Sequence, residues 1–293
     1  MDEQSMNPGN SIEIMKRCIP FAKMHGCGND FLIMDNRQEE WEGKELGAIA
    51  RRLCNRETAL GADGCMWVEK SDVADFSMRY FNADGSEGEM CGNGARCIAR
   101  YAFEKGIAPA AMRFAAKDGL YHSLVEGRWV DVYFPAMDRA DFFLNRRYEA
   151  MDGARQYHFA VVGVPHTVWF VADTEEMSDE QVSAWGKAIR YDHSIFPDGV
   201  NVNFVQIADE NKLKIRTYER GVERETLACG SGATASAITS SLLGLVASPV
   251  TVLTRGGELR VSFRLENNLV RDIVLGGPTR WVASGYLLPE MWM

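Results

Sequence analysis

Two short segments that begin with cysteine, 138 residues apart (229 − 91), constrain the fold of this chain more than any other feature. They read Cys91-Gly92-Asn93-Gly94-Ala95 and Cys229-Gly230-Ser231-Gly232-Ala233, and a helical pattern of small residues follows each. Similar segments in one order at nearly one spacing indicate an internal duplication, and this spacing is the length of a domain. Two further pairs lie 135 residues apart (163 − 28 and 198 − 63): Gly28-Asn29-Asp30-Phe31 with Gly163-Val164-Pro165-His166, and Asp63-Gly64 with Asp198-Gly199.

Each predicted half is rich in strands and contains one helix of small residues. Apolar periodicity predicts helices over 44–55, about 91–105, about 178–191 with Ser178 or Asp179 as N-cap, and about 232–244. Alternating apolar residues between turn signals predict strands over 21–26, 31–35, 65–69, 75–82, 111–117, 120–125, 128–134, 157–163, 167–172, 201–207, 212–218, 250–254, 258–265, 269–275 and 280–287. We therefore predict an α+β fold of two pseudo-symmetric domains. In each, a mostly antiparallel, barrel-like sheet wraps around a central helix, and the active site lies in the cleft between the domains.

The duplication, rather than any change in composition, places the domain boundary near residue 135. We expect a first domain of residues 1–134 plus 279–293, which carries Cys91, and a second domain of residues 135–278, which carries Cys229. Residues 1–17 are expected to form a loose N-terminal extension.

Charge and cysteine content exclude several classes of protein. The net charge of −9, with no local cluster of lysine and arginine, argues against a nucleic-acid surface. The N-terminal segment lacks the apolar core of a signal peptide, and no run of 18 apolar residues could span a bilayer. Seven cysteines without zinc-ligand spacing suggest free thiols in a reducing cytoplasm. No pyridoxal-phosphate lysine or phosphate loop is evident, so we expect neither a cofactor nor a metal ion.

A cysteine at the start of a helix lies beside backbone N–H groups that have no partner within the helix. These groups and the helix dipole favour a thiolate, so we expect the pKa values of Cys91 and Cys229 to fall below the ordinary value of about 8.5. The flanking glycines let a small anion approach the same N–H groups. A single cysteine before a helix more often only packs as a small apolar side chain. The repetition favours chemistry here, and we assign Cys18, Cys27, Cys54, Cys65 and Cys97 to packing.

Two equivalent thiols facing one cleft suit inversion at a tetrahedral carbon. One thiolate removes a proton, and the thiol on the opposite face delivers another, so the pair titrates as a coupled unit. The N–H groups at both helix starts could hold the substrate carboxylate and stabilise its developing charge. These residues predict a racemase or epimerase that needs no cofactor.

Several segments, taken together, resemble the diaminopimelate epimerase family over nearly the whole chain from about residue 21. They are His25-Gly26-Cys27-Gly28-Asn29-Asp30-Phe31, Phe81-Asn82-Ala83-Asp84-Gly85-Ser86, the segment at Cys91, Tyr218-Glu219-Arg220-Gly221 and the segment at Cys229. The resemblance implies interconversion of L,L- and meso-diaminopimelate for lysine and peptidoglycan synthesis, by two cysteines and no cofactor. It also implies a cytoplasmic enzyme and a homodimer.

The resemblance assigns roles to individual residues. Cys91 and Cys229 would be the acid and base, and His166 and Glu219 would tune the pKa values of the thiols. The residues that would bind substrate are Asn29, Asn82, Gly92, Asn93, Asn201, Glu219, Arg220, Gly230 and Ser231. The guanidinium of Arg220 would suit a carboxylate at the unreactive end of the substrate.

The chain departs from the family pattern at three places. The family often has Asn at the position of Val164, and some members have Gln at that of Gly64, so two polar contacts are lost. Where many members read Val-Tyr-Asp-Gly, with a tyrosine that supports dimerisation, this chain has Val282-Ala283-Ser284-Gly285.

Other functions remain open at this level. Turn-forming asparagines often serve only the local backbone, and neighbouring Glu219 and Arg220 could form a surface ion pair. The same fold could racemise histidine, proline or hydroxyproline. A Cys–His acyl-transfer enzyme would use Cys91 or Cys229 as nucleophile and His166 as base. A thiol redox sensor or a binding module without turnover is a third alternative.

Overall fold

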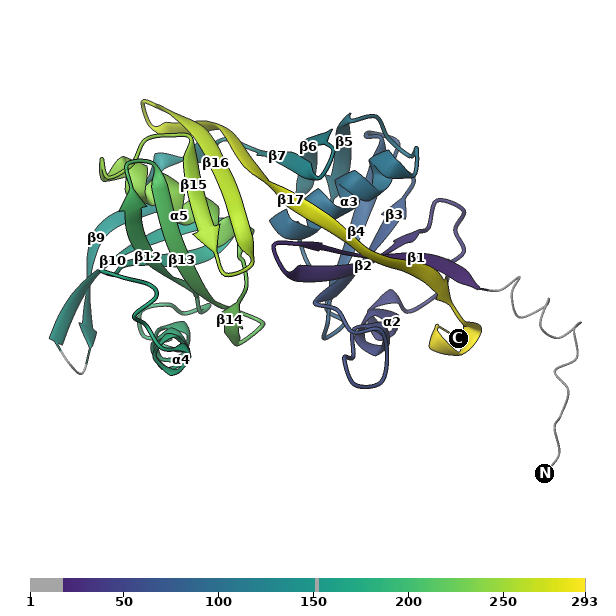
Figure 1. The fold of residues 1–293 in the computed structure, drawn as a ribbon, viewed down its shortest axis with the longest axis horizontal. Coiled ribbons are helices and arrows are strands. Elements are labelled where there is room, and N and C mark those ends of the chain that lie inside the picture. Colours follow the sequence, from purple (N-terminus) through teal and green to yellow (C-terminus); the bar gives the residue numbers. More distant parts are fainter. Residues whose placement is uncertain (1–17, 151–152, 293) are drawn as a thin grey trace, which may run out of the picture.

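The computed structural model describes residues 18–150 and 153–292, which form two lobes, and one long strand runs from one lobe to the other (Figure 1). The predicted extension 1–17 lies outside the described residues. The first lobe contains β1 (Ile19–Gly26), β2 (Asn29–Asp35), α2 (Leu46–Leu53), β3 (Gly64–Glu69), β4 (Phe76–Asn82), α3 (Gly92–Glu104), β5 (Ala111–Ala116), β6 (Gly119–Glu126) and β7 (Trp129–Phe134).

The second lobe follows through two short elements, β8 (Met137–Asp138) and the 3-10 helix η1 (Arg139–Asp141). It contains β9 (Phe142–Ala150), β10 (Gly153–Val162), β11 (Val164–Phe170), α4 (Asp179–Arg190), β12 (Asn201–Asp209), β13 (Lys212–Glu219), β14 (Arg224–Thr226), α5 (Gly230–Leu242), β15 (Val250–Thr254), β16 (Gly257–Glu266) and β17 (Leu269–Leu287). A last 3-10 helix, η2 (Pro289–Met291), follows β17.

Strand pairing repeats between the lobes, which confirms the predicted duplication. In the first lobe β1–β2 is antiparallel, β2–β3 parallel, β3–β4 antiparallel and β4–β5 parallel, and β5, β6 and β7 continue antiparallel. The second lobe shows the same series from β10 through β11, β12, β13, β15 and β16 to β17. Helices α2 and α4, and α3 and α5, stand at equivalent places in the two series.

The long strand β17 links the lobes and closes the first one. Its residues 273–278 pair with β7, and its residues 279–287 pair with β1. β17 therefore connects the first and last strands of the first lobe and closes its sheet. We expected two strands here, 269–275 and 280–287, because Gly276-Gly277-Pro278 reads as a break. These glycines instead allow a close crossing, since a Cβ on Gly276 would lie 2.2 Å from the Asp131 Oδ1 and one on Gly277 would lie 2.6 Å from the Leu259 Cδ2.

Each sheet wraps around one helix of small residues. The buried apolar face of α3 packs among β1, β2, β6 and β7, and that of α5 packs among β10, β11, β12 and β16. Small side chains such as Ala95, Ala99, Ala233 and Ala237 let the strands approach closely, and all four are fully buried. These observations confirm the predicted fold class. Three strands were not predicted, β8, β9 and β14. β9 reads FFLNRRYEA, which lacks the expected alternation, and β8 and β14 span only two and three residues.

Candidate active site

Cys91 and Cys229 are the N-cap residues of α3 and α5 and have nearly the same extended backbone. Their φ and ψ angles are −110° and 119° for Cys91, and −117° and 114° for Cys229. The two helix starts meet at the junction of the lobes. A Cβ on Gly92 would lie 3.9 Å from the Gly230 Cα, and a Cβ on either glycine would lie 2.9 Å from the Leu275 Cδ2 of β17. Glycine at both positions therefore lets the helices approach end to end.

Asn93, in the first turn of α3, connects the two lobes. Its Nδ2 donates to the carbonyl oxygen of Ala228 at 3.0 Å and to the Asn29 Oδ1 at 3.2 Å. Its Oδ1 accepts from the Arg96 Nη2 at 2.7 Å. The side chain is buried, so these bonds fix its orientation.

Asn29 lies against the thiol of Cys91. The Cys91 Sγ donates to the Asn29 Oδ1 at 3.7 Å, and the Asn29 Nδ2 donates to the Asp63 Oδ2 at 2.8 Å. Asn29 also lines a cavity of about 410 Å³ whose other lining residues are Lys23, His25, Gly28, Asp30, Arg56, Asp63, Arg224, Thr226, Leu227 and Val282. Because these residues come from both lobes, this cavity lies at their junction beside the candidate site.

Asn201 and Arg220 are neighbours in the second lobe. The Asn201 Oδ1 accepts from the backbone N–H of Arg220 at 2.8 Å, and its Nδ2 donates to the Pro165 carbonyl oxygen at 3.3 Å. The Arg220 Nη1 donates to the Asp198 carbonyl oxygen at 3.0 Å. The surface ion pair of Arg220 with Glu219, which was the alternative to a role in the site, is not among the ion pairs of residues 18–150 and 153–292.

Glu219 is an acidic group that acts on both thiols. Its Oε2 accepts from the Thr226 Oγ1 at 2.8 Å, and burial raises the pKa of its carboxyl group to about 7. Its negative charge in turn raises the pKa values of Cys91 and Cys229.

His166 lies within β11, opposite Asn201 of β12, and is fully buried. Burial, together with the nearby charge of Arg220, lowers its pKa to about 3, so the imidazole is neutral near pH 7. Its Nδ1 lies 3.3 Å from the Asn203 Nδ2, and its Nε2 has no hydrogen-bond partner within the described part of the chain. A neutral imidazole can act on a thiol as a dipole or hydrogen-bond partner, but not as a cation.

The expected lowering of the thiol pKa values is wrong for this structure. Burial raises the pKa of Cys91 to about 11 and raises that of Cys229 further. The N–H groups of Gly94 and Asn93 do lower the pKa of Cys91, and Ser231, whose Oγ lies 3.5 Å from the Cys229 Sγ, lowers that of Cys229. Removal from water outweighs these groups at both thiols, because Cys229 is 5% exposed and Cys91 is half-buried.

Asn82 is held by Tyr80, a residue that sequence reasoning missed. The Tyr80 hydroxyl donates to the Asn82 Oδ1 at 2.7 Å, and the Asn82 Nδ2 donates to the Ser86 Oγ. Burial, followed by the charges of Cys91 and Glu219, raises the pKa of Tyr80 well above its ordinary value. A Cβ on Gly64 would lie 2.5 Å from the Tyr80 ring, so the ring occupies the space beside this glycine.

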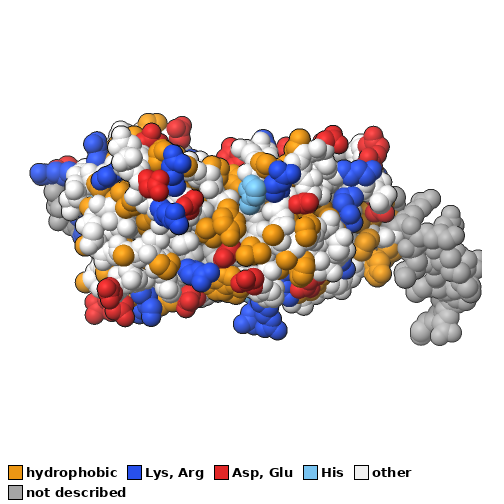
Figure 2. Space-filling view, turned by 90° about the horizontal axis from the view of Figure 1, so that it is seen from above, with side chains coloured by type: hydrophobic (Ala, Val, Ile, Leu, Met, Phe, Trp, Pro, Cys, Tyr) orange, Lys and Arg blue, Asp and Glu red, His pale blue; other side chains and the backbone are white. Residues whose placement is uncertain are grey.

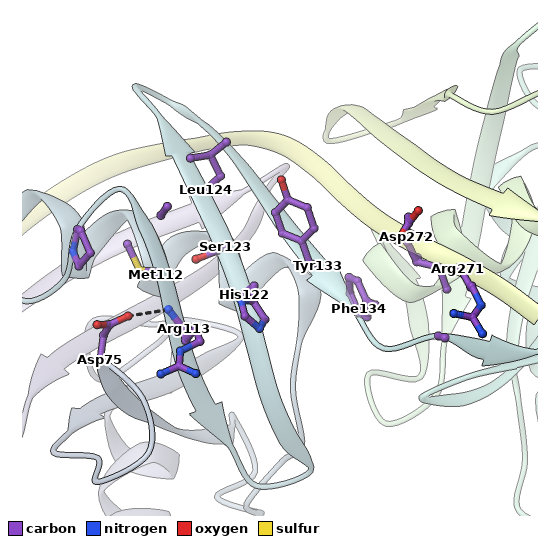
Figure 3. Close-up of a pocket in the computed structure, with 14 residues that line it drawn as sticks. Asp75, Met112, Arg113, His122, Ser123, Leu124, Tyr133, Phe134, Arg271 and Asp272 are labelled. Carbon is purple, nitrogen blue, oxygen red and sulfur yellow. Dashed lines mark hydrogen bonds between the residues drawn. The ribbon is translucent and has the colours of Figure 1, made fainter.

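A larger cavity, of about 660 Å³, lies elsewhere at the lobe junction (Figure 3). It is lined by strands β5, β6 and β7 and by Arg271, Asp272 and Ile273 of β17. None of the residues predicted for the site lines it, so its size does not make it the active site.

Comparisons with known proteins bear on the family and the fold of this chain. The family model described as diaminopimelate epimerase matches residues 21–129 and 159–282. A diaminopimelate epimerase of Hydrogenobaculum sp. is 41% identical over 282 residues, which cover 92% of this chain and 99% of that protein. One of Aquifex aeolicus is 41% identical over 284 residues, covering 92% and 98%. The solved structure of a probable proline racemase from Agrobacterium radiobacter superimposes with a TM-score of 0.70 at 15% identity, over 92% of this chain and 93% of that one, which supports the fold alone.

Proposed function

Because the chain belongs to the diaminopimelate epimerase family, we propose that it interconverts L,L- and meso-diaminopimelate without a cofactor. The product would supply lysine and peptidoglycan synthesis. One observation carries the proposal: two cysteines are the N-caps of equivalent helices whose first residues meet at the lobe junction.

In the proposed reaction the thiolate of Cys91 removes the α-proton from one face of the substrate. The electron pair stays on the α-carbon and delocalises into the α-carboxylate, while the Cys229 thiol donates its proton to the opposite face. Cys91 then holds the proton and Cys229 is the thiolate, which is the state that catalyses the reverse direction. Cys91 is more exposed to water than Cys229, which supports its assignment as the thiolate in the free enzyme.

The remaining predicted residues bind and orient the substrate. N–H groups around Gly92, Asn93, Gly230 and Ser231 hold the reacting carboxylate, since four N–H groups at each helix start lack helical partners. Arg220 pairs with the distal carboxylate. Asn29, Asn82, Asn201 and Glu219 bind the polar groups of the substrate, and His166 and Glu219 tune the thiols.

The proposal also divides the chain into domains of residues 1–134 plus 279–293 and 135–278. Pairing of residues 279–287 with β1 of the first lobe supports the second boundary. The two cores, one around α3 and one around α5, support a division near residue 135.

Cytoplasmic location and a homodimer are further parts of the proposal. Cys27, Cys54, Cys65, Cys91, Cys97 and Cys229 are unpaired thiols, as a reducing compartment would keep them. Val282 and Tyr286 on β17 are 55% and 65% exposed and offer an apolar contact for a second copy, which sedimentation of the wild type and of Tyr286→Lys would test.

None of the described helices is long and apolar enough to cross a membrane. On the face in Figure 2, acidic and basic side chains are interspersed, which does not favour a nucleic acid.

Incubation with candidate amino acids in D₂O tests the function. We expect α-deuterium uptake with L,L-diaminopimelate, and a loss of at least about 1,000-fold in Cys91→Ser and in Cys229→Ser, since each thiol is the acid or base on one face. Cys97→Ala is the matched control, because this cysteine is buried in the core of the same helix. Uptake with histidine or proline but not with diaminopimelate would contradict the substrate assignment.

A further inference from the structure

Arg96 is a buried cation that forms no ion pair within the described part of the chain. Its side chain is fully buried in the first lobe, and no carboxylate of residues 18–150 or 153–292 lies within 4.0 Å of its guanidinium. Its Nη2 donates to the Asn93 Oδ1 at 2.7 Å and its Nη1 to the Gly92 carbonyl oxygen at 3.2 Å, while its Nε has no partner. An unpaired buried charge is costly, so its presence calls for a compensating role.

Two strands leave space for this guanidinium. A Cβ on Gly26 of β1 would lie 3.1 Å from the Arg96 Nη2, and one on Gly277 of β17 would lie 3.2 Å from its Nε and 3.4 Å from its Cζ. The absence of side chains at both positions lets the charged group lie between β1, β17 and α3. The surrounding backbone thus accommodates an arginine in particular.

The charge of Arg96 acts on three thiols of the first lobe. Its charge lowers the pKa values of Cys27, Cys91 and Cys97, each of which burial raises. Of these three, Cys91 alone lies at the helix start where the two lobes meet. Glu219 of β13 is the acidic group that raises the pKa of Cys91. The charge of Cys91 in turn raises the pKa values of three groups, which are Tyr80 of β4, Cys97 of α3 and Cys229 of α5.

The second half of the duplication lacks this cation. The position equivalent to Arg96, 138 residues later, is Thr234. The Thr234 Oγ1 donates to the Gly230 carbonyl oxygen at 3.0 Å, just as the Arg96 Nη1 donates to that of Gly92. The hydrogen bond to the helix start is therefore kept in both halves, but the positive charge is present only beside Cys91.

We propose that Arg96 is a positioning residue that makes the pseudo-symmetric site asymmetric. It supplies the charge that makes Cys91, rather than Cys229, the thiolate of the free enzyme, and it holds Asn93 in the orientation that joins the lobes. This inference rests on the proposed two-thiol function, which it deepens.

The test compares Arg96→Met and Arg96→Lys with Arg100→Met. Arg100 is the matched control, because it lies one turn further along α3 but pairs with Glu104 at 2.6 Å. The rate of alkylation of Cys91 by iodoacetamide is measured from pH 6 to 10 by site-resolved mass spectrometry, without substrate, and folding is checked by thermal unfolding. Because this rate follows the thiolate fraction at pH values below the thiol pKa of about 11, a tenfold lower rate at one pH corresponds to a midpoint one pH unit higher.

We expect Arg96→Met to move the midpoint for Cys91 upward by about one pH unit or more and to reduce kcat/KM at least about tenfold. Arg96→Lys keeps the charge, so its midpoint stays near that of the wild type, and Arg100→Met leaves it unchanged. An unchanged midpoint in folded Arg96→Met overturns the proposal. If that variant does not fold, a midpoint raised by a full unit in folded Arg96→Lys overturns it. Failure of the wild type to turn over diaminopimelate would contradict the proposed function but leave the alkylation result standing.

Discussion

The side-chain amide of Asn93 donates a 3.0 Å hydrogen bond to the carbonyl oxygen of Ala228, the residue just before Cys229. One bond thus joins the start of α3 to the segment that leads into α5. The relative placement of the two thiols depends on it, because each cysteine is the cap of its helix.

Asn93→Ala should therefore impair both catalysis and folding. The variant leaves the Ala228 carbonyl without this donor, and we expect a loss of about 1–3 kcal/mol in the free energy of unfolding and of about 10–100-fold in kcat/KM. Asn211→Ala is the control, because the Asn211 Oδ1 accepts from the backbone of Ala247 far from either cysteine. Equal activity losses in the two variants would refute a specific role for Asn93.

Glu219→Gln should make both thiols react at lower pH. The negative charge of Glu219 in the wild type raises the pKa values of Cys91 and Cys229, so removing that charge lowers them. Iodoacetamide alkylation of each cysteine, measured against pH, checks this expectation. Glu225→Gln is a control of the same charge change, because Glu225 pairs with Arg216. Midpoints that stay the same or rise in Glu219→Gln would contradict the assigned effect.

Glu219 should also make stability depend on pH. Its pKa is raised from 4.5 to about 7 in the folded state, so the protonated form favours folding. This contribution is complete below pH 4.5 and is lost as pH rises to above 7, whereas glutamine does not titrate. We therefore expect the free energy of unfolding of Glu219→Gln, relative to wild type, to increase by about 1–3 kcal/mol from pH 4.5 to 8. Urea titrations at both pH values measure it, and a difference that stays constant would contradict the raised pKa.

Tyr80→Phe should weaken substrate binding rather than chemistry. It removes the hydroxyl that holds the Asn82 Oδ1 at 2.7 Å while leaving the ring beside Gly64. The loss of one neutral hydrogen bond, about 1 kcal/mol, predicts a KM for diaminopimelate raised about fivefold with kcat nearly unchanged. Steady-state kinetics on purified variant and wild type decide the matter; a fall in kcat at constant KM would place Tyr80 in the chemical step instead.

The fold could be predicted from the sequence because the duplication repeats local signals. Cysteine, glycine and alanine recur at equivalent places, and Ser178, one of the two predicted N-caps, begins α4, where it forms a capping box with Gln181. The continuity of β17 could not be predicted, because the glycines that normally break a strand here serve a close crossing with Asp131 and Leu259. That contact is set by tertiary packing.

The site was predicted less completely than the fold. The structure places Asn29 in contact with both Cys91 and Asn93. The thiol pKa values are raised rather than lowered, because local sequence shows the helix start and not the depth of burial. Arg96 was missed although its position offered a signal. A charged residue among Ala95, Ile98 and Ala99 on a helix of small residues is unusual enough to suggest a buried role.

The central claim is that two thiols act on opposite faces of one carbon. The most direct measurement is the deuterium content of both diastereomers at low conversion of L,L-diaminopimelate in D₂O. A two-thiol mechanism predicts α-deuterium in the newly formed meso product and essentially none in the recovered L,L substrate. Equal early deuteration of recovered substrate and product would mean that a single group exchanges its proton and serves both faces, which would contradict the account.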